Sequence, residues 1–108
     1  MTDTIDLILR RRSIRRFSEQ PVDEAVLTRL LEAAMAAPSA MNLQPWEFIV
    51  VTDPQLLRQL RERLIFGRYH APAAIIVCGH PGVTHNPAAG QFWVQDCSAA
   101  VENLFSVV

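Results

Sequence analysis

Only two stretches of this chain have the composition of β-strands, and they limit what it can fold into. Residues 46–52 (WEFIVVT) are rich in β-branched and aromatic side chains, and residues 73–78 (AAIIVC) are apolar throughout. The unbroken apolar run is typical of a strand that is covered on both faces. An isolated pair of strands is marginal in water, because three or more are normally needed. We therefore expect the missing strands to come from a partner, or this chain to be a fragment.

Helical patterns surround the two strands. Thr2 or Asp3 is a candidate N-cap of a first helix, a second runs from Asp23 to Pro38, and Asp53 begins a third. A polar loop covers 39–45, a second loop covers 80–90, and a last helix begins at Gln91 and runs to the end of the chain. The order helix, helix, strand, helix, strand, helix predicts one layered domain of mixed α/β type over residues 1–108. The apolar residues at helical spacing are Ile5, Leu7, Ile8 and Leu9; Val26, Leu27, Leu30, Leu31, Ala34 and Met35; Leu56, Leu57, Leu60 and Leu64; and Phe92, Cys97, Val101, Leu104 and Phe105.

Composition and charge narrow the classes of function. Half of the residues are apolar and the net charge is -1, so the chain has no global field that would recruit nucleic acid or an acidic membrane. No apolar run approaches the roughly 20 residues of a bilayer span, and the N-terminus lacks the basic start of a leader. We therefore expect a cytoplasmic protein with neither nucleic-acid nor membrane partners. Cys78 and Cys97 are expected to be reduced core thiols, and His70, His80 and His85 match no common zinc spacing.

Arginines gather near the N-terminus in the sequence RRRSIRRF, residues 10–17. Arginine side chains and a serine hydroxyl can hold a phosphate through several charge-assisted hydrogen bonds. In an extended stretch, alternation would place Arg11, Ser13 and Arg15 on one side and leave Ile14 packing inward on the other. A solvated basic turn and a nucleic-acid patch are the alternative interpretations. The nucleic-acid patch is the weaker of these, because the chain offers no second basic face and few aromatic platforms.

A second polar stretch, PSAMNLQPW (38–46), lies between a helix and a strand. Pro38 and Pro45 restrict its backbone, and Ser39, Asn42 and Gln44 supply hydrogen-bonding groups. Such a loop can hold a planar heteroaromatic ring by its edge, but it can also be an ordinary connection whose polar side chains bind backbone.

Taken together, these stretches resemble the nitroreductase family of flavin enzymes. The resemblance rests on RRSIRRF and on APSAMNLQPWEFIVVTD, with support from APAAIIV (71–77) and from FWVQD and AAVENL in the last helix, and it covers almost the whole chain. It implies an α+β homodimer with FMN between the subunits. It also implies an oxidoreductase that takes hydride from NADH or NADPH and passes electrons to nitroaromatics, quinones or similar acceptors. The flavin would do the hard chemistry, so no catalytic acid–base pair is expected.

The resemblance also assigns cofactor contacts. Arg11, Ser13 and Arg15 match positions that contact the FMN phosphate, ribityl chain and ring edge, and Arg12 lies within the same motif and would contribute through its backbone. A cation at Arg15 would stabilise the anionic reduced flavin. A further set matches positions that contact the FMN of the other subunit: Pro38, Ser39, Ala40 and Asn42. Gln44 matches a family position that is either structural or next to the flavin.

The sequence departs from the family in its length. Family members continue after the central helix with further strands, a glycine-containing loop over one flavin face and a late basic residue on the phosphate. This chain ends at Val108, within the helix, so we expect an N-terminal portion of the domain with an incomplete phosphate site. An FMN-dependent oxidoreductase is therefore one hypothesis, and a truncated, non-catalytic remnant that dimerises or binds flavin weakly is the second. A small interaction domain with a basic turn is the third.

Overall fold

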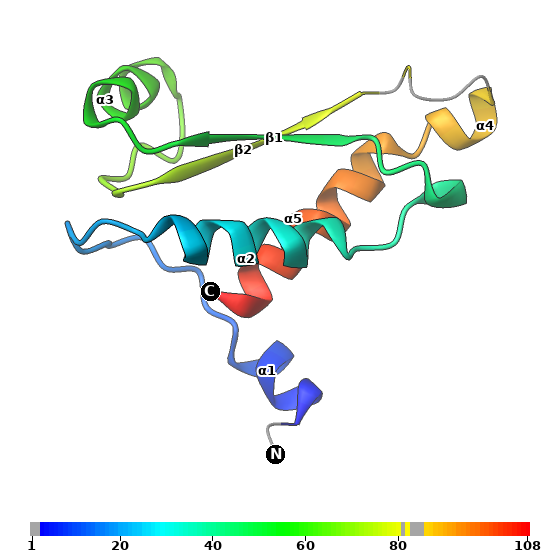
Figure 1. The fold of residues 1–108 in the computed structure, drawn as a ribbon, viewed down its shortest axis with the longest axis horizontal. Helices are drawn as coiled ribbons and strands as arrows, with labels where there is room; N and C mark the ends of the chain where they lie inside the picture. Colours follow the sequence, from blue (N-terminus) through cyan, green and yellow to red (C-terminus); the bar gives the residue numbers. More distant parts are fainter. Residues whose placement is uncertain (1–2, 81, 83–85) are drawn as a thin grey trace.

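The two predicted strands pair with each other and form the centre of the molecule (Figure 1). The computed structural model describes residues 3–80, 82 and 86–108. Strands β1 (Trp46–Val51) and β2 (Ala74–Gly79) run antiparallel, with Trp46 opposite Gly79 and Val51 opposite Ala74. Both predicted strands are confirmed, although β1 ends one residue earlier than predicted and β2 begins and ends one residue later. Within the described ranges these two strands are the whole sheet.

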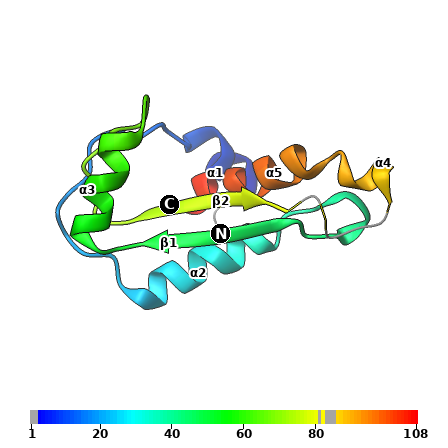
Figure 2. The same ribbon diagram turned by 90° about the horizontal axis from the view of Figure 1, so that it is seen from above.

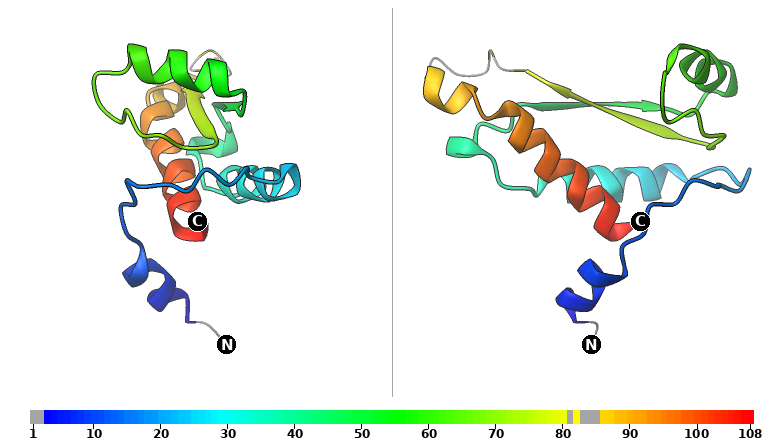
Figure 3. Two further views of the ribbon diagram at one scale, coloured as in Figure 1. Left: turned by 90° about the vertical axis from the view of Figure 1, so that its left-hand side faces the viewer. Right: turned by 180° about the vertical axis from the view of Figure 1, so that it is seen from behind.

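One face of the sheet carries the core. Opposed residues share a face in an antiparallel pair, so Trp46, Phe48, Ile75 and Val77 point the same way. They pack with helices α2 (Glu24–Met35) and α5 (Trp93–Val107), which lie together on that side (Figure 3). Helix α3 (Pro54–Arg63) lies on the other side, near one end of the sheet (Figure 1).

The prediction that the second strand is covered on both faces is wrong. Every residue of β2 is only half-buried, and Ile49 on the outer face of β1 is 51% exposed. The reason is that the two long helices cover a single face and α3 lies near only one end of the other. The apolar run therefore marks a strand whose outer face this chain does not close.

Small residues let α2 and α5 approach closely. Ala34 and Ala100 are fully buried, and both belong to the core cluster that also contains Trp46 and Leu104. The side-chain amide of Asn103 donates to the carbonyl oxygen of Ala33 at 2.8 Å, so a polar contact fixes the register of the two helices. At the end of β2, Gly79 leaves room for the ring of Trp93, since a Cβ there would lie 1.9 Å from Cε3 of that ring.

Capping side chains explain where the shorter helices begin. The carboxylate of Asp3 accepts from the N–H of Ile5 at the start of α1 (Thr4–Arg10), and Asp53 does the same for Gln55 at the start of α3. The N-cap Asp3 is therefore confirmed, whereas the alternative Thr2 lies outside the described residues.

The predicted loop 80–90 contains a short helix, α4 (Pro87–Gly90), so that prediction is wrong over its last four residues. Asn86 accepts from the N–H groups of Ala88 and Ala89, and Pro87 occupies the first helical position. The last long helix consequently begins at Trp93 rather than at Gln91. An N-cap side chain followed by proline also correctly located the start of α3, where the pair is Asp53 and Pro54.

Helix α1 stands apart from the rest of the fold in Figure 1, whereas it overlaps α5 in the view from above (Figure 2). None of its residues is buried, and Ile8 and Leu9 are 58% and 68% exposed. The Cα radius of gyration is 15.3 Å, whereas a compact chain of this length has about 13 Å. Other apolar residues of the predicted helical patterns also stay at least 40% exposed, because none of the described segments covers them: Val26, Met35, Leu56, Phe92 and Phe105. No described helix is long and apolar enough to cross a membrane.

The α2–α5 contact predicts that Ala34→Leu lowers the free energy of unfolding by about 1–3 kcal/mol, because the added carbons have no space between the helices. Ala25→Leu is a matched control, since Ala25 is exposed on the same helix, and its effect should stay within about 0.5 kcal/mol. Urea unfolding followed by circular dichroism measures both. Equal midpoints for the two variants would contradict this packing.

Candidate functional site

The arginine segment forms an irregular strand-like connection between α1 and α2. Residues 11–17 have no regular secondary structure, and Arg11 is half-buried while the others are exposed. Arg11 donates through Nη1 to Oγ of Ser13 at 3.5 Å, so two of the three cofactor contacts predicted in this segment lie together. The guanidinium of Arg15 makes no hydrogen bond or ion pair with the part of the chain that the structure describes.

Arg12 has a structural task of its own. Its Nη1 donates to the carbonyl oxygens of Leu9 and Arg11 at 3.1 and 3.0 Å, where α1 ends. A cationic donor at a helix C-terminus satisfies carbonyls that lack partners within the helix. The prediction that Ile14 packs inward is wrong, since its side chain is 56% exposed. The segment leaves α1 without lying against the core, so neither of its two sides is buried.

The arginines of residues 10–16 retain uncompensated positive charge. Ion pairs in the described ranges join Arg29 to Glu32 and Arg58 to Glu62, both outside this cluster. Five guanidinium groups within seven residues therefore repel one another without a neutralising carboxylate. Such a cluster favours binding of an anion, and the planar guanidinium suits the oxygens of a phosphate.

The second predicted stretch is a pre-shaped loop. It contains a single 3₁₀ turn, η1 (Ala40–Asn42), where a loop without helix was predicted. Met41, Asn42 and Gln44 have φ angles of 52°, 53° and 51°, in the left-handed region that non-glycine residues rarely occupy. The hydroxyl of Ser39 accepts from the N–H of Gln44 at 3.0 Å, which closes the loop on itself.

Two side chains from elsewhere in the chain hold this loop. Asp96 in the first turn of α5 accepts through Oδ1 from the N–H of Ala40 at 3.0 Å. The side-chain amide of Asn86 donates to the sulfur of Met41 at 3.4 Å. Sequence reasoning missed both. The available signal for Asp96 was its helical spacing with Cys97, Ala100 and Leu104, which places a carboxylate at the edge of an apolar face.

The two predicted stretches do not meet within one chain. The arginine segment leads to the start of α2, the loop follows its end, and the two lie near opposite ends of that helix (Figure 1). The side-chain amides of the loop are at the surface, because Asn42 and Gln44 are exposed. Of the other predicted contacts in the loop, Pro38 is exposed, and Ser39 and Ala40 are half-buried. A ligand that touches both stretches must therefore be shared between two copies of the chain or be long enough to span α2.

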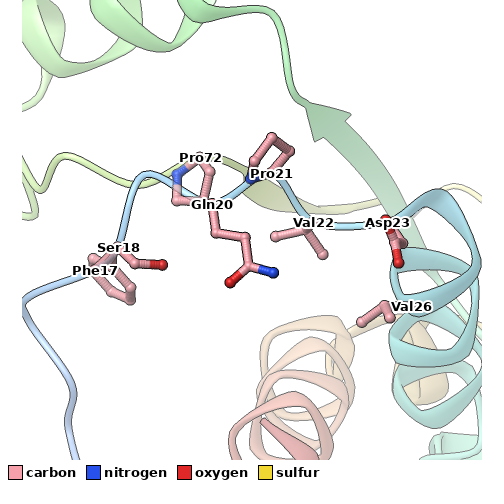
Figure 4. Close-up of a pocket in the computed structure, with 8 residues that line it drawn as sticks. All are labelled: Phe17, Ser18, Gln20, Pro21, Val22, Asp23, Val26 and Pro72. Atoms are coloured by element: carbon pink, nitrogen blue, oxygen red, sulfur yellow. The ribbon is translucent and has the colours of Figure 1, made fainter.

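Two concave surfaces are formed by the described residues. An open cavity of about 380 Å³ lies between residues 17–26 and Pro72 (Figure 4). Phe17 lines it and also packs against Tyr69, with ring centroids 6.2 Å apart. A second groove, of about 440 Å³, runs along α5 and includes Trp93, Val101 and Phe105. None of the predicted cofactor contacts lines either cavity.

The described cysteines and histidines form no metal cluster with one another or with carboxylates. His70 and His80 are exposed, and His85 lies outside the described residues. Cys97 is buried, as expected, whereas Cys78 is only half-buried, and both are free thiols. Burial above all, with the charges of Asp96 and Cys78 in second place, raises the pKa of the Cys97 thiol. Its thiol donates to the carbonyl oxygen of Cys78 at 3.9 Å.

Comparison with known proteins gives the family context. The sequence profile of the Nitroreductase family matches residues 8–68, which include both predicted stretches. A relative from Archaeoglobus fulgidus, named as a candidate NADH dehydrogenase/NAD(P)H nitroreductase, is 44% identical over 96% of this chain and 60% of its own length. The crystal structure of a Parabacteroides distasonis protein with the same name matches 98% of this chain and 61% of that protein, with a TM-score of 0.85 and 38% identity.

A second solved structure, a nitroreductase with bound FMN from Bacteroides fragilis, matches 98% of this chain and 64% of that protein. Its TM-score is 0.79 and its identity is 25%. This chain thus spans about 60% of the length of the relatives it matches. The α+β fold predicted from the sequence is confirmed by these structures.

The raised pKa and burial of Cys97 predict slow alkylation. In the native protein at mildly alkaline pH, iodoacetamide should label Cys97 at least roughly tenfold more slowly than Cys78, because its thiolate is scarce and its sulfur is covered. The single-thiol variants Cys78→Ser and Cys97→Ser isolate each rate for mass spectrometry. In concentrated urea the two rates should converge, and equal native rates would show that Cys97 is not shielded.

Proposed function

The chain belongs to the nitroreductase family, and from this premise we propose that it is an FMN-dependent oxidoreductase that passes electrons from NADH or NADPH to nitroaromatic, quinone or similar acceptors. The single observation that carries the proposal is the unpaired arginine cluster, in which Arg11 and Ser13 already lie together. The names of the Archaeoglobus fulgidus relative and the FMN bound to the Bacteroides fragilis protein support the same chemistry. A cytoplasmic location belongs to this proposal.

The donor set at the arginine segment fits a phosphate. In the proposed complex Arg11, Ser13 and Arg15 bind the FMN phosphate and ribityl chain or approach the ring edge. The side chain of Arg12 caps α1, so its contribution is limited to its backbone N–H. When bound, the flavin supplies the hydride and electron chemistry. The protein binds and orients it.

The second stretch supplies the proposed contacts to the ring system. The residues proposed to contact the flavin belong to one loop: Pro38, Ser39, Ala40, Asn42 and Gln44. Its left-handed residues fix the directions of its backbone and side chains before any ligand binds. Pre-organisation of this kind lowers the entropic cost of binding. The exposed amides of Asn42 and Gln44 are free to approach a flavin edge.

We further propose a homodimer in which each FMN lies between subunits. The separation of the two stretches along α2 supports this arrangement, because a partner's loop can complete a site that one chain leaves open. The apolar surface of α1 and the groove along α5 support it too, since uncovered apolar surface of this kind favours association.

A second candidate function is a non-catalytic remnant that dimerises or binds flavin weakly. The observation that favours it is that the sheet has only two strands within the described residues, because an isolated pair of strands is marginal in water. The two proposals differ in one measurement. An oxidoreductase carries flavin absorbance and oxidises NAD(P)H with a nitroaromatic or quinone, whereas a remnant stays inactive with added FMN.

The phosphate assignment predicts that Arg11→Ala and Arg15→Ala each weaken FMN binding roughly tenfold or more, because each removes a charge-assisted hydrogen bond worth about 1.5–3 kcal/mol. Quenching of flavin fluorescence gives the affinity. Arg58→Ala is the matched control, since it removes the same charge from an exposed site on α3 and should leave the affinity unchanged. Full affinity in both cluster variants would refute the assignment.

The dimer proposal predicts that Ile8→Glu converts the protein to monomers. No residue of α1 is buried within the chain, so the fold of the monomer and its circular dichroism should be retained. Leu56→Glu, which places the same charge on an exposed apolar residue of α3, should leave the dimer intact. Analytical ultracentrifugation distinguishes these results. A monomeric wild-type protein would overturn the proposal.

A further inference from the structure

Asp96 is the only buried polar or charged residue among those the structure describes, with 6% of its surface exposed. It belongs to the first turn of α5, and its Oδ1 accepts from the N–H of Ala40, 56 residues earlier in the chain. Asn103, seven residues later on the same helix, donates to Ala33 at the end of α2. One face of α5 therefore fixes both the end of α2 and the loop that follows it.

The loop that Asp96 holds needs external support. Left-handed Met41, Asn42 and Gln44 are each disfavoured by contact between Cβ and the backbone, and none is glycine. Such a conformation persists only where the surrounding structure over-determines it. The bond from Gln44 to Ser39 lies within the loop, so it cannot orient the loop relative to the rest of the molecule. The partly buried bond from Ala40 to Asp96, on another element of the fold, can do so.

Stability alone does not account for a carboxylate at this position. Oδ2 of Asp96 is buried and has no hydrogen-bond partner among the described residues. Burying a charged oxygen without a partner is costly, and the bond from Ala40 engages only the other oxygen, Oδ1. Costly polar groups of this kind concentrate where a precise geometry serves a function.

We propose that Asp96 is a positioning residue for the flavin: by holding the N–H of Ala40, it sets the directions in which Ser39, Asn42 and Gln44 meet the cofactor. The inference rests on the proposed FMN site. Asp96 does not itself touch the flavin in this scheme, because both of its oxygens are buried beneath the loop or bonded to it. It acts only through the backbone of residues 39–44.

The test compares Asp96→Ala with Asp96→Asn. The alanine variant removes the acceptor, and the asparagine variant keeps an acceptor oxygen of the same reach while it removes the charge. Leu57→Ala is the control, because Leu57 is buried in α3, away from the loop, and its truncation destabilises the protein by a different route. Two quantities are measured for each protein: FMN affinity from fluorescence quenching, and amide hydrogen exchange of residues 39–44.

Asp96→Ala should weaken FMN binding roughly tenfold or more and accelerate exchange in residues 39–44 ahead of the rest of the chain. Asp96→Asn should retain FMN affinity within about threefold, because its amide oxygen still accepts from the N–H of Ala40. Leu57→Ala should accelerate exchange throughout and bind FMN normally whenever it is folded. Equal affinity of Asp96→Ala and wild type, or unchanged exchange of its loop, would overturn the inference. Failure of wild type to bind FMN would instead overturn the proposed function.

Discussion

The contact between α2 and α5 is the constraint on which the rest of the molecule depends. Ala34 and Ala100 are completely buried where the helices meet, and the amide of Asn103 bonds to the backbone of α2 beside them. The same pair of helices covers one face of the two-stranded sheet. Once α5 is held in this register, its first turn places Asp96 under the loop that follows α2. The position of the loop in the candidate site thus depends on helix packing more than on local sequence.

Local signals were strong enough to predict most of the fold. The β-branched and aromatic composition of one run and the continuous apolar character of the other located the two strands, and Asp53 with Pro54 located the start of α3. Among the mispredicted features of the fold, two have different reasons. The short helix α4 has the same cap-and-proline signal, but four residues are too few to show a periodic pattern. The burial of β2 was overestimated, because an apolar run shows that a face can be covered and not that this chain covers it.

The cofactor contacts proposed from the sequence stay a prediction, and the structure adds their geometry. Residue types, alternation in an extended stretch and the family resemblance singled out Arg11, Ser13 and Arg15, and the structure brings the first two together. The sequence could not show that the guanidinium of Arg12 turns back to α1, because that depends on where the helix ends. It could not show that Asp96 supports the loop either, since a contact across 56 residues follows from tertiary packing.

Uncovered apolar surface and a divided binding site have a common physical explanation in the proposed dimer. A helix with no buried residue and a sheet with an open outer face leave this chain with a small core of its own. Association would cover part of that surface. A flavin bound between two copies would bind the associated state more tightly than the separated chains, so each event would strengthen the other by the same free energy. On this argument, cofactor binding and the stability of the fold are coupled properties of one assembly.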